Sequence, residues 1–321
     1  FGVYLSPWDR NSKYYGTPEY NDYYVNQLTE LCTEYGKLFM VWFDGACGEG
    51  PNGKKQVYDF ERYIAVIRKY QPDACIFNDF GPDVRWCGNE GGTPRRAEWA
   101  VVPSELCYRS EKQTDGALLE GDLSYLYNSE ENIGDLSVIQ YSKALVFTGA
   151  EIDMSIRPGW FYHEKEEPHS LERLFRTYLN SCGANTSFNL NVPPMPSGRF
   201  DPRDIARLKE LGDALRNAFG EEKKIPVTVE RLDTGDGTQA RIEIRLPEKR
   251  KIRFVDLKEN IAEGQRIESF RLLSGGNCIY RGYTVGHRKI CPVNAETDCV
   301  TLFVTAARDT VDLREIAVYG E

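Results

Sequence analysis

The chain has 321 residues, which is long enough for two domains that each bury a core. Its net charge is -9, and the sequence has no basic stripe that could displace counterions. This argues against nucleic acid or an anionic membrane surface as a partner. Aromatic residues make up 12% of the chain, and this share favours a protein that binds flat, half-apolar ligands such as sugar rings.

The nine cysteines occur singly, with no C-x-x-C pair, and the chain has three histidines. This spacing argues against a structural zinc site. The odd count favours buried free thiols over a disulfide framework, although an oxidising compartment stays open. No apolar run approaches the length of about 20 residues that a membrane span needs.

The first half of the chain alternates strand and helix patterns. Strands are predicted at residues 1–7, 37–45 and 74–81, with helices at 19–36 and 57–72 between them. The first helix has apolar residues at helical spacing and Asn21 as a possible N-cap, and it ends at Gly36. This alternation is typical of a parallel sheet with helical crossovers.

The same alternation continues to residue 220. Its predicted elements are a helix at 136–150, a strand at 151–160, a helix at 170–183, a strand at 186–194 and a helix at 201–220. Residues 1–220 therefore form the predicted β/α domain, with five β-α units.

After residue 220 the pattern changes to short β-rich runs separated by Gly, Asp and Asn. Residues 221–225 are the expected linker, and runs such as 240–247 and 252–259 indicate antiparallel strands. The sequence therefore predicts a C-terminal antiparallel β-sandwich over residues 226–321.

The β/α domain could be part of a (β/α)8 barrel or a doubly wound open sheet. No glycine-rich phosphate-binding motif follows any predicted strand, which disfavours the nucleotide-binding form of the open sheet. Instead, polar or aromatic residues gather where the strands end, as expected for a barrel active site. These residues are Asp9, Asp44, Asn78, Asp79, Arg157, Trp160 and Asn191.

Two acidic residues are candidates for catalysis. Asp44 ends an apolar strand, although an Asp before Gly is also a common turn former or helix cap. Glu90 lies in a loop with Trp86 and several glycines, where a solvated acid is the alternative. Two carboxylates on neighbouring loops are what glycoside hydrolysis requires.

Several segments together resemble the α-L-fucosidases of glycoside hydrolase family 29. The motifs "VWFDGA" and "VRWCGNEGG", in that order, look most like the branch that prefers α-1,3/1,4-linked fucose. The resemblance covers nearly the whole chain, and its segments are "FGVYLSPWDRN", "YNDYYVNQLTELCTEYG", "VWFDGACGEG", "VRWCGNEGG", "GWFYH", "LNVPP", "VDLKENIAEGQRIESF" and "GYTVGHRKI".

The resemblance implies a retaining exo-glycosidase that acts on terminal α-L-fucosyl groups of oligosaccharides or glycoconjugates. It implies Asp44 as the nucleophile and Glu90 as the acid/base, with no metal or organic cofactor. It also suggests a secreted or periplasmic protein. A carbohydrate-binding homologue without activity is the main alternative, and a glycosidase of another specificity, such as galactoside cleavage, is the third.

Five further residues are expected to contact the substrate. Trp42 could stack on a sugar face or pack in the core. Arg157 could reach the fucose hydroxyls or the nucleophile, or it could pair with Asp153. The other three are Trp8, Trp86 and Trp160.

The chain departs from the family pattern at its start. The "HWG"-like and "KHHDGF"-like segments, whose histidines hold the fucose hydroxyls in the family, do not occur in it. Its own histidines are His163, His169 and His287. We therefore expect the chain to lack the N-terminal strands of the barrel.

Overall fold

The computed structural model describes residues 1–79, 81–104, 132–232 and 237–321. Contacts divide the chain into two compact units, each described here by itself. Unit 1 comprises residues 1–88 and 101–150, and unit 2 comprises residues 89–100 and 151–321. This division differs from the predicted one, which separated residues 1–220 from 226–321.

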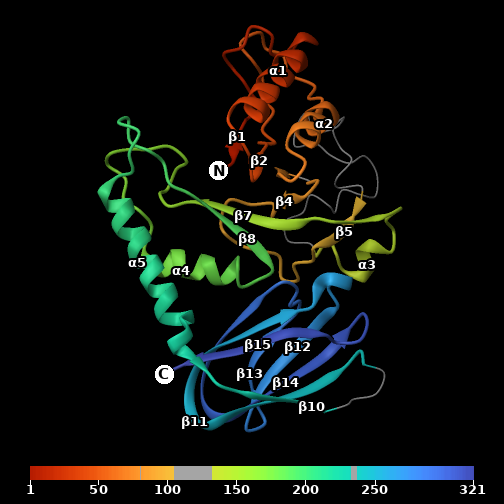
Figure 1. Cartoon of the computed structure of the whole chain (residues 1–321), viewed down its shortest axis with the longest axis vertical. Helices are drawn as coiled ribbons and strands as arrows, with labels where there is room; N and C mark the ends of the chain where they lie inside the picture. Colours follow the sequence, from red (N-terminus) through yellow and green to blue (C-terminus); the bar gives the residue numbers. More distant parts are fainter. Residues whose placement is uncertain (80, 105–131, 233–236) are drawn as a thin grey trace. The chain divides into compact units, whose positions relative to one another are not determined.

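Unit 1 begins with short parallel strands connected by helices (Figure 1). Its elements are β1 (Val3–Tyr4), α1 (Glu19–Glu34), β2 (Met40–Trp42), α2 (Phe60–Tyr70), β3 (Cys75–Asn78) and β4 (Val84–Trp86). Strand β2 pairs in parallel with β1 and β3, placing Val41 between Val3 and Ile76. Because all four strands run the same way, residues that follow them meet at one edge of the sheet.

Helices α1 and α2 pack beside each other through an aromatic core (Figure 1). Tyr24 packs against Tyr63 with ring centroids 4.3 Å apart, and both residues are buried. Asn21 is not the N-cap of α1, because the helix already begins at Glu19 after Pro18. Its side chain instead binds the turn before α2, where its amide donates to the Val57 carbonyl at 3.1 Å.

The predicted helix at 136–150 is mostly wrong. Only α3 (Leu136–Ile139) is helical, and β6 (Leu145–Phe147) pairs antiparallel with β5 (Val101–Pro103). The run Leu-Val-Phe has the branched and aromatic side chains that suit a strand, and its partner lies far away in the sequence. Local periodicity could not reveal that partner.

The barrel part of unit 2 follows the prediction. Its elements are β7 (Gly149–Ser155), α4 (Leu171–Asn180), β8 (Thr186–Asn191) and α5 (Pro202–Phe219). Ser170 caps α4 by accepting the Arg173 N–H, and Asp201 caps α5 by accepting the Arg203 N–H. The strand order of the sheet is β1-β2-β3-β4-β7-β8.

The C-terminal sheet is antiparallel, with strand order β13-β12-β14-β11-β15-β9 and β10 paired to β11. Its strands are β9 (Lys224–Ile225), β10 (Thr228–Leu232), β11 (Ala240–Glu259), β12 (Ile267–Ser274), β13 (Asn277–Gly282), β14 (Lys289–Ala307) and β15 (Leu313–Gly320). The runs 240–247 and 252–259 are one strand, β11, with a register irregularity between Arg245 and Arg250. Such an irregularity bends a long strand while its pairing continues.

The segment 221–225, expected to be a linker, is structured. Residues Glu221–Lys223 form the 3-10 helix η3, and β9 pairs Ile225 with Val318 of β15. Figure 1 shows α5 in green leading into the blue C-terminal sheet, and aromatic side chains from both elements share one cluster.

The fold class is confirmed as a partial (β/α) barrel followed by an antiparallel β-sandwich. Eight cysteines of the described residues are free, while Cys107 lies outside them. None of the helices that the structure describes is both long and apolar enough to cross a membrane.

Candidate active site

Asp44 lies two residues after the end of β2, and both of its carboxylate oxygens accept hydrogen bonds. The Tyr4 hydroxyl donates to Oδ2 at 2.5 Å, and the Ala46 backbone N–H donates to Oδ1 at 2.8 Å. The second bond is the local turn contact that an Asp before Gly often makes. The first joins the ends of two neighbouring strands, so the carboxylate is oriented by the sheet as well as by its own turn.

Tyr4 is a site residue that the sequence analysis missed. It ends β1 next to Trp42 in the β1–β2 register, and its ring stacks on Trp42 with centroids 5.3 Å apart. Burial raises the pKa of Tyr4, and the hydrogen bond to Asp44 raises it further, so the phenol stays the donor. The sequence signal that could have identified Tyr4 is a polar side chain near the end of a predicted parallel strand.

Trp42 lies between two other rings. It stacks on Phe77 with centroids 4.0 Å apart and an interplanar angle of 6°, and on Tyr4 on its other side. Trp42 is half-buried, and its packing between these rings matches the expectation that it could pack in the core. A sugar contact through the rest of the ring stays a prediction.

Asp79 follows β3 and lies next to Asp44. The Gly45 backbone N–H donates to its carboxyl group, and burial together with the charge of Asp44 raises its pKa to about 7. When two carboxyl groups lie close together in a partly buried site, the charge on one disfavours ionisation of the other. The end of β3 thus brings a second acid to the position where β2 ends.

Glu90 lies in unit 2, in a loop stabilised by Asn89. The Asn89 side-chain oxygen accepts the backbone N–H groups of Gly91 at 3.0 Å and Thr93 at 3.3 Å. The carboxylate of Glu90 accepts a hydrogen bond from the Trp160 indole at 3.2 Å. Two residues predicted separately from the sequence, Glu90 and Trp160, are therefore partners.

Trp160 is itself held by Asn191, another residue from the end of a strand. The Asn191 amide donates to the Trp160 carbonyl at 3.0 Å and to the Ser155 hydroxyl at 3.0 Å. The ring of Trp160 is 36% exposed, so it can contact a ligand while it holds Glu90. Residues after β7 and at the end of β8 thus support the loop that carries Glu90.

Arg157 is buried in ion pairs with the start of α5. Its side chain is buried, and Nε donates to both carboxylate oxygens of Asp204 at 3.0 and 2.9 Å. Nη2 lies 3.2 Å from Asp201, at the N-terminus of α5. Arg157 therefore forms an ion pair, with Asp204 and Asp201 in place of the expected Asp153, and its contact with a substrate stays a prediction.

The remaining two tryptophans that were predicted to contact the substrate, Trp8 and Trp86, lie in unit 1. Trp8 is half-buried against the α1–α2 core, with the Arg10 guanidinium 5.7 Å from its ring centroid. Trp86 is half-buried at the end of β4. Their contact with a substrate stays a prediction.

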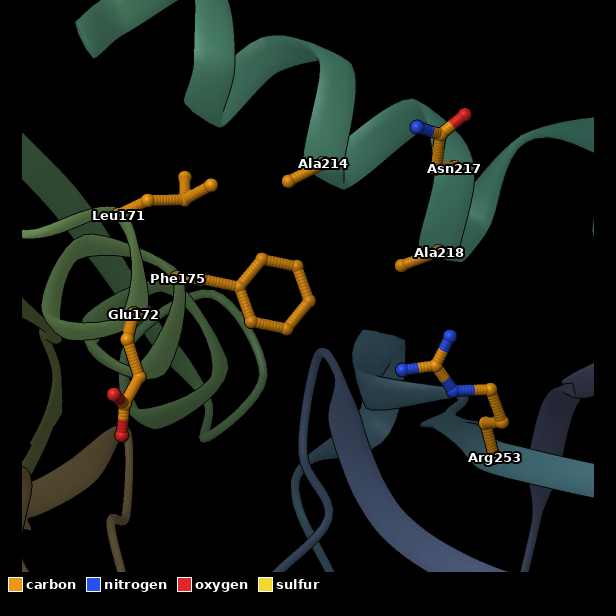
Figure 2. Close-up of a pocket in the computed structure, with 7 residues that line it drawn as sticks. All are labelled: Leu171, Glu172, Phe175, Ala214, Asn217, Ala218 and Arg253. Atoms are coloured by element: carbon orange, nitrogen blue, oxygen red, sulfur yellow. The ribbon is translucent and has the colours of Figure 1, made fainter.

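One cavity of about 400 Å³ lies between α4, α5 and β11 in unit 2 (Figure 2). Its lining is mostly apolar, and none of the predicted site residues belongs to it. The lining residues are Leu171, Glu172, Phe175, Ala214, Asn217, Ala218 and Arg253. In the part of the chain that the structure describes, no group of three or more His, Cys, Asp or Glu side chains could hold a metal ion.

Known proteins resemble this chain in sequence and in structure. It is 41% identical over 219 residues to alpha-L-fucosidase 1 of Arabidopsis thaliana, an alignment that covers 68% of the chain and 39% of that protein. A crystal structure from Bacteroides ovatus, named as an alpha-L-fucosidase, is 36% identical with a TM-score of 0.85. The match covers 100% of this chain and 55% of the Bacteroides ovatus chain.

A family 29 fucosidase from Ruminococcus gnavus, in complex with fucose, is 25% identical with a TM-score of 0.79, and the match covers 100% of this chain and 72% of that one. The chain thus spans 39% and 55% of the first two relatives. The family model for alpha-L-fucosidase matches residues 2–220. A match over more than half of the chain, by the segment that carries Asp44 and Glu90, shows that the chain belongs to the alpha-L-fucosidase family.

Proposed function

We propose that the protein carrying this chain is a retaining exo-α-L-fucosidase. The observation that supports this most is Asp44, a carboxylate at the end of a parallel strand that is oriented by Tyr4 and bordered by stacked aromatic rings. A fixed carboxylate beside an apolar ring suits attack on a sugar, whose faces are apolar and whose anomeric carbon becomes positive in the transition state.

In the first step, Asp44 attacks the anomeric carbon of the fucosyl group, and the bond from that carbon to the aglycone oxygen breaks. Glu90 gives its proton to this oxygen, so the aglycone leaves as a neutral alcohol. In the second step, Glu90 takes a proton from water, whose oxygen attacks the anomeric carbon and displaces Asp44. Both carboxyl groups return to their starting protonation states, and the configuration is retained.

The indole of Trp160 donates to Glu90 and so favours one orientation of its carboxyl group. The opposite oxygen is then free to face the leaving group. A glycine-rich loop can move when substrate binds, and the contact with Trp160 gives this loop a defined resting position.

The substrate that we propose is a terminal α-1,3- or α-1,4-linked fucose of an oligosaccharide or glycoconjugate. The motifs "VWFDGA" and "VRWCGNEGG" support this linkage, since they resemble that branch of the family. The fucose complex of the Ruminococcus gnavus relative supports fucose as the sugar. Hydrolysis of Lewis-type trisaccharides and of α-1,2-fucosyllactose, measured side by side, tests the preference.

Substitution of the nucleophile tests the mechanism. In the protein that carries this chain, Asp44→Ala should abolish turnover of an aryl α-fucoside. Azide should restore turnover and give the β-fucosyl azide, because a small anion can occupy the place of the missing carboxylate. Turnover of Asp44→Ala at the wild-type rate would exclude the assignment, and fucose binding without turnover by the wild type would favour a binding protein.

Substitution of the acid tests the second role. Glu90→Ala should lose far more activity on natural oligosaccharides than on aryl fucosides, because a good leaving group needs little proton donation. Glu49→Ala, a change of another loop acid, serves as the control and should affect both substrates equally. Equal losses in Glu90→Ala would contradict an acid role for Glu90.

A further inference from the structure

Gly45, directly after Asp44, is a glycine for reasons of packing. Its φ lies outside the left-handed region, so its backbone conformation is open to other residues. A Cβ at this position would nevertheless overlap the carboxyl group of Asp79, whose three outer atoms are its nearest neighbours. The missing side chain therefore makes room for Asp79 against the backbone that follows Asp44.

Asp79 uses this room to bind the same peptide. The Gly45 N–H donates to its carboxyl group, while the next N–H, that of Ala46, donates to Asp44. Two successive backbone donors are thus divided between two acids. A shift of Asp79 would move the Gly45 peptide, and with it the turn that orients Asp44.

Asp44 is also the charged group that faces Asp79 from the end of β2, and Tyr4 faces Asp44 from the end of β1. Strand β2 is the neighbour of β3 on this side of the sheet, and β1 is the next strand beyond β2. A negative charge on Asp79 would therefore act on the place where a sugar gains positive charge during its attack by Asp44.

We propose that Asp79 is a positioning residue for the nucleophile: its carboxyl group fixes the Gly45 peptide and adds a negative charge beside Asp44. The inference rests on the proposed function. It adds Asp79 as a residue that acts on the reaction through Asp44. The reaction itself is unchanged, because Asp79 forms no bond with the sugar.

The main test is Asp79→Asn, whose side-chain oxygen can still accept the Gly45 N–H. We expect kcat/KM for an aryl fucoside to fall about tenfold, which corresponds to about 1.4 kcal/mol of lost transition-state stabilisation. The wild type should show a limb that rises as pH passes about 7, where Asp79 ionises, and the variant should lack it. Asp73→Asn, at the other end of β3, is the matched control and should change neither quantity.

A stability measurement gives a readout that does not need activity. The folded state holds the Asp79 proton up to about pH 7, whereas the unfolded chain releases it near 3.8. Because the folded state binds more protons in this window, its stability falls as pH rises from about 4 to 7 and levels off above. The urea midpoint of the wild type should therefore fall relative to that of Asp79→Asn across this window.

A double substitution tests the packing. Gly45→Ala should lower both activity and stability, because its methyl group displaces Asp79. In the double variant Gly45→Ala/Asp79→Ala, the methyl group has room, so the loss of stability should be smaller than the sum of the two single losses. Gly149→Ala, where no atom lies within 4 Å of the added carbon, is the control.

The results distinguish a failure of the proposed function from a failure of the role proposed for Asp79. An inactive wild-type protein would reject the proposed function, and the stability measurements would still judge Asp79. An active wild type with an equally active Asp79→Asn would overturn the inference. A loss of activity with an unchanged pH profile would also overturn it, because packing alone would then explain the loss.

Discussion

At the scale of single residues, the hydrogen bond from Tyr4 to Asp44 can be tested by removal of one oxygen atom. Tyr4→Phe keeps the ring that stacks on Trp42 and removes the donor to Oδ2. Because Tyr4 is 59% exposed, water can replace its hydroxyl as a donor to the carboxylate, so the unfolding midpoint should stay near that of the wild type. The effect should instead be seen in kcat.

The expected change is a fall in kcat of about tenfold or more for an aryl fucoside. The phenol fixes the carboxylate in the orientation from which it attacks, and a freely rotating carboxylate reaches that orientation less often. Tyr14→Phe is the matched control, since Tyr14 is also a partly exposed tyrosine of unit 1 but lies away from Asp44. Equal activities of both variants would show that Tyr4 does not orient the nucleophile.

The sequence predicted single residues well where a rule of position applied. Asp44, Asp79, Trp160 and Asn191 were expected at strand ends because side chains there meet at one edge of a parallel sheet. The structure places Asp44, Asp79 and Asn191 at such ends, whereas Trp160 lies in the loop after β7. The same rule also selected Arg157, whose buried partners Asp204 and Asp201 lie more than 40 residues later in the chain. Position along a strand does not reveal whether a side chain faces a ligand or the core.

At the scale of elements, Arg157 connects the loop after β7 to the start of α5. Arg157→Met would leave Asp204 buried without its cationic partner, because both side chains are fully buried. Loss of one member of a buried ion pair costs about 3 to 5 kcal/mol. We expect this loss in the free energy of unfolding, measured by urea denaturation.

The control for this prediction is Arg216→Met, on the same helix α5. Arg216 pairs with Asp213, but the two side chains are 69% and 52% exposed. An exposed pair contributes about 1 kcal/mol or less, so this variant should stay close to the wild type. Similar stabilities of the two variants would mean that the buried pair does not hold the loop to α5.

Elements with a strong local pattern were predicted closely, and those defined by distant partners were not. Helices α2, α4 and α5 begin at a capping Asp or Ser, signals that are visible in the sequence. Among the strands that the structure describes, β5 and β6 pair only with each other, across 41 intervening residues from Pro103 to Leu145, and no local pattern marks that pairing.

At the scale of the molecule, the boundary predicted at residue 220 crosses a shared core. Phe219, the last residue of α5, lies 4.9 Å from Phe254 of β11 and 5.5 Å from Tyr319 of β15, measured between ring centroids. Phe175 of α4 joins the same cluster. The composition change after residue 220 marks a change of secondary structure, while the contacts make α4, α5 and the C-terminal sheet one compact unit.

Phe219→Ala tests whether this cluster couples α5 to the sheet. Removal of a large, packed aromatic side chain from a core costs about 3 to 5 kcal/mol, and we expect about 2 to 4 kcal/mol here because Phe219 is only half-buried. Since the ring contacts both elements, backbone amides of α5 and of β15 should lose protection from hydrogen exchange together. Phe200→Ala, which removes a ring that is 48% exposed before α5 begins, should change the stability by about 0.5 kcal/mol or less. Loss of protection in α5 alone would show that the helix and the C-terminal sheet unfold independently, and that residue 220 is a true boundary.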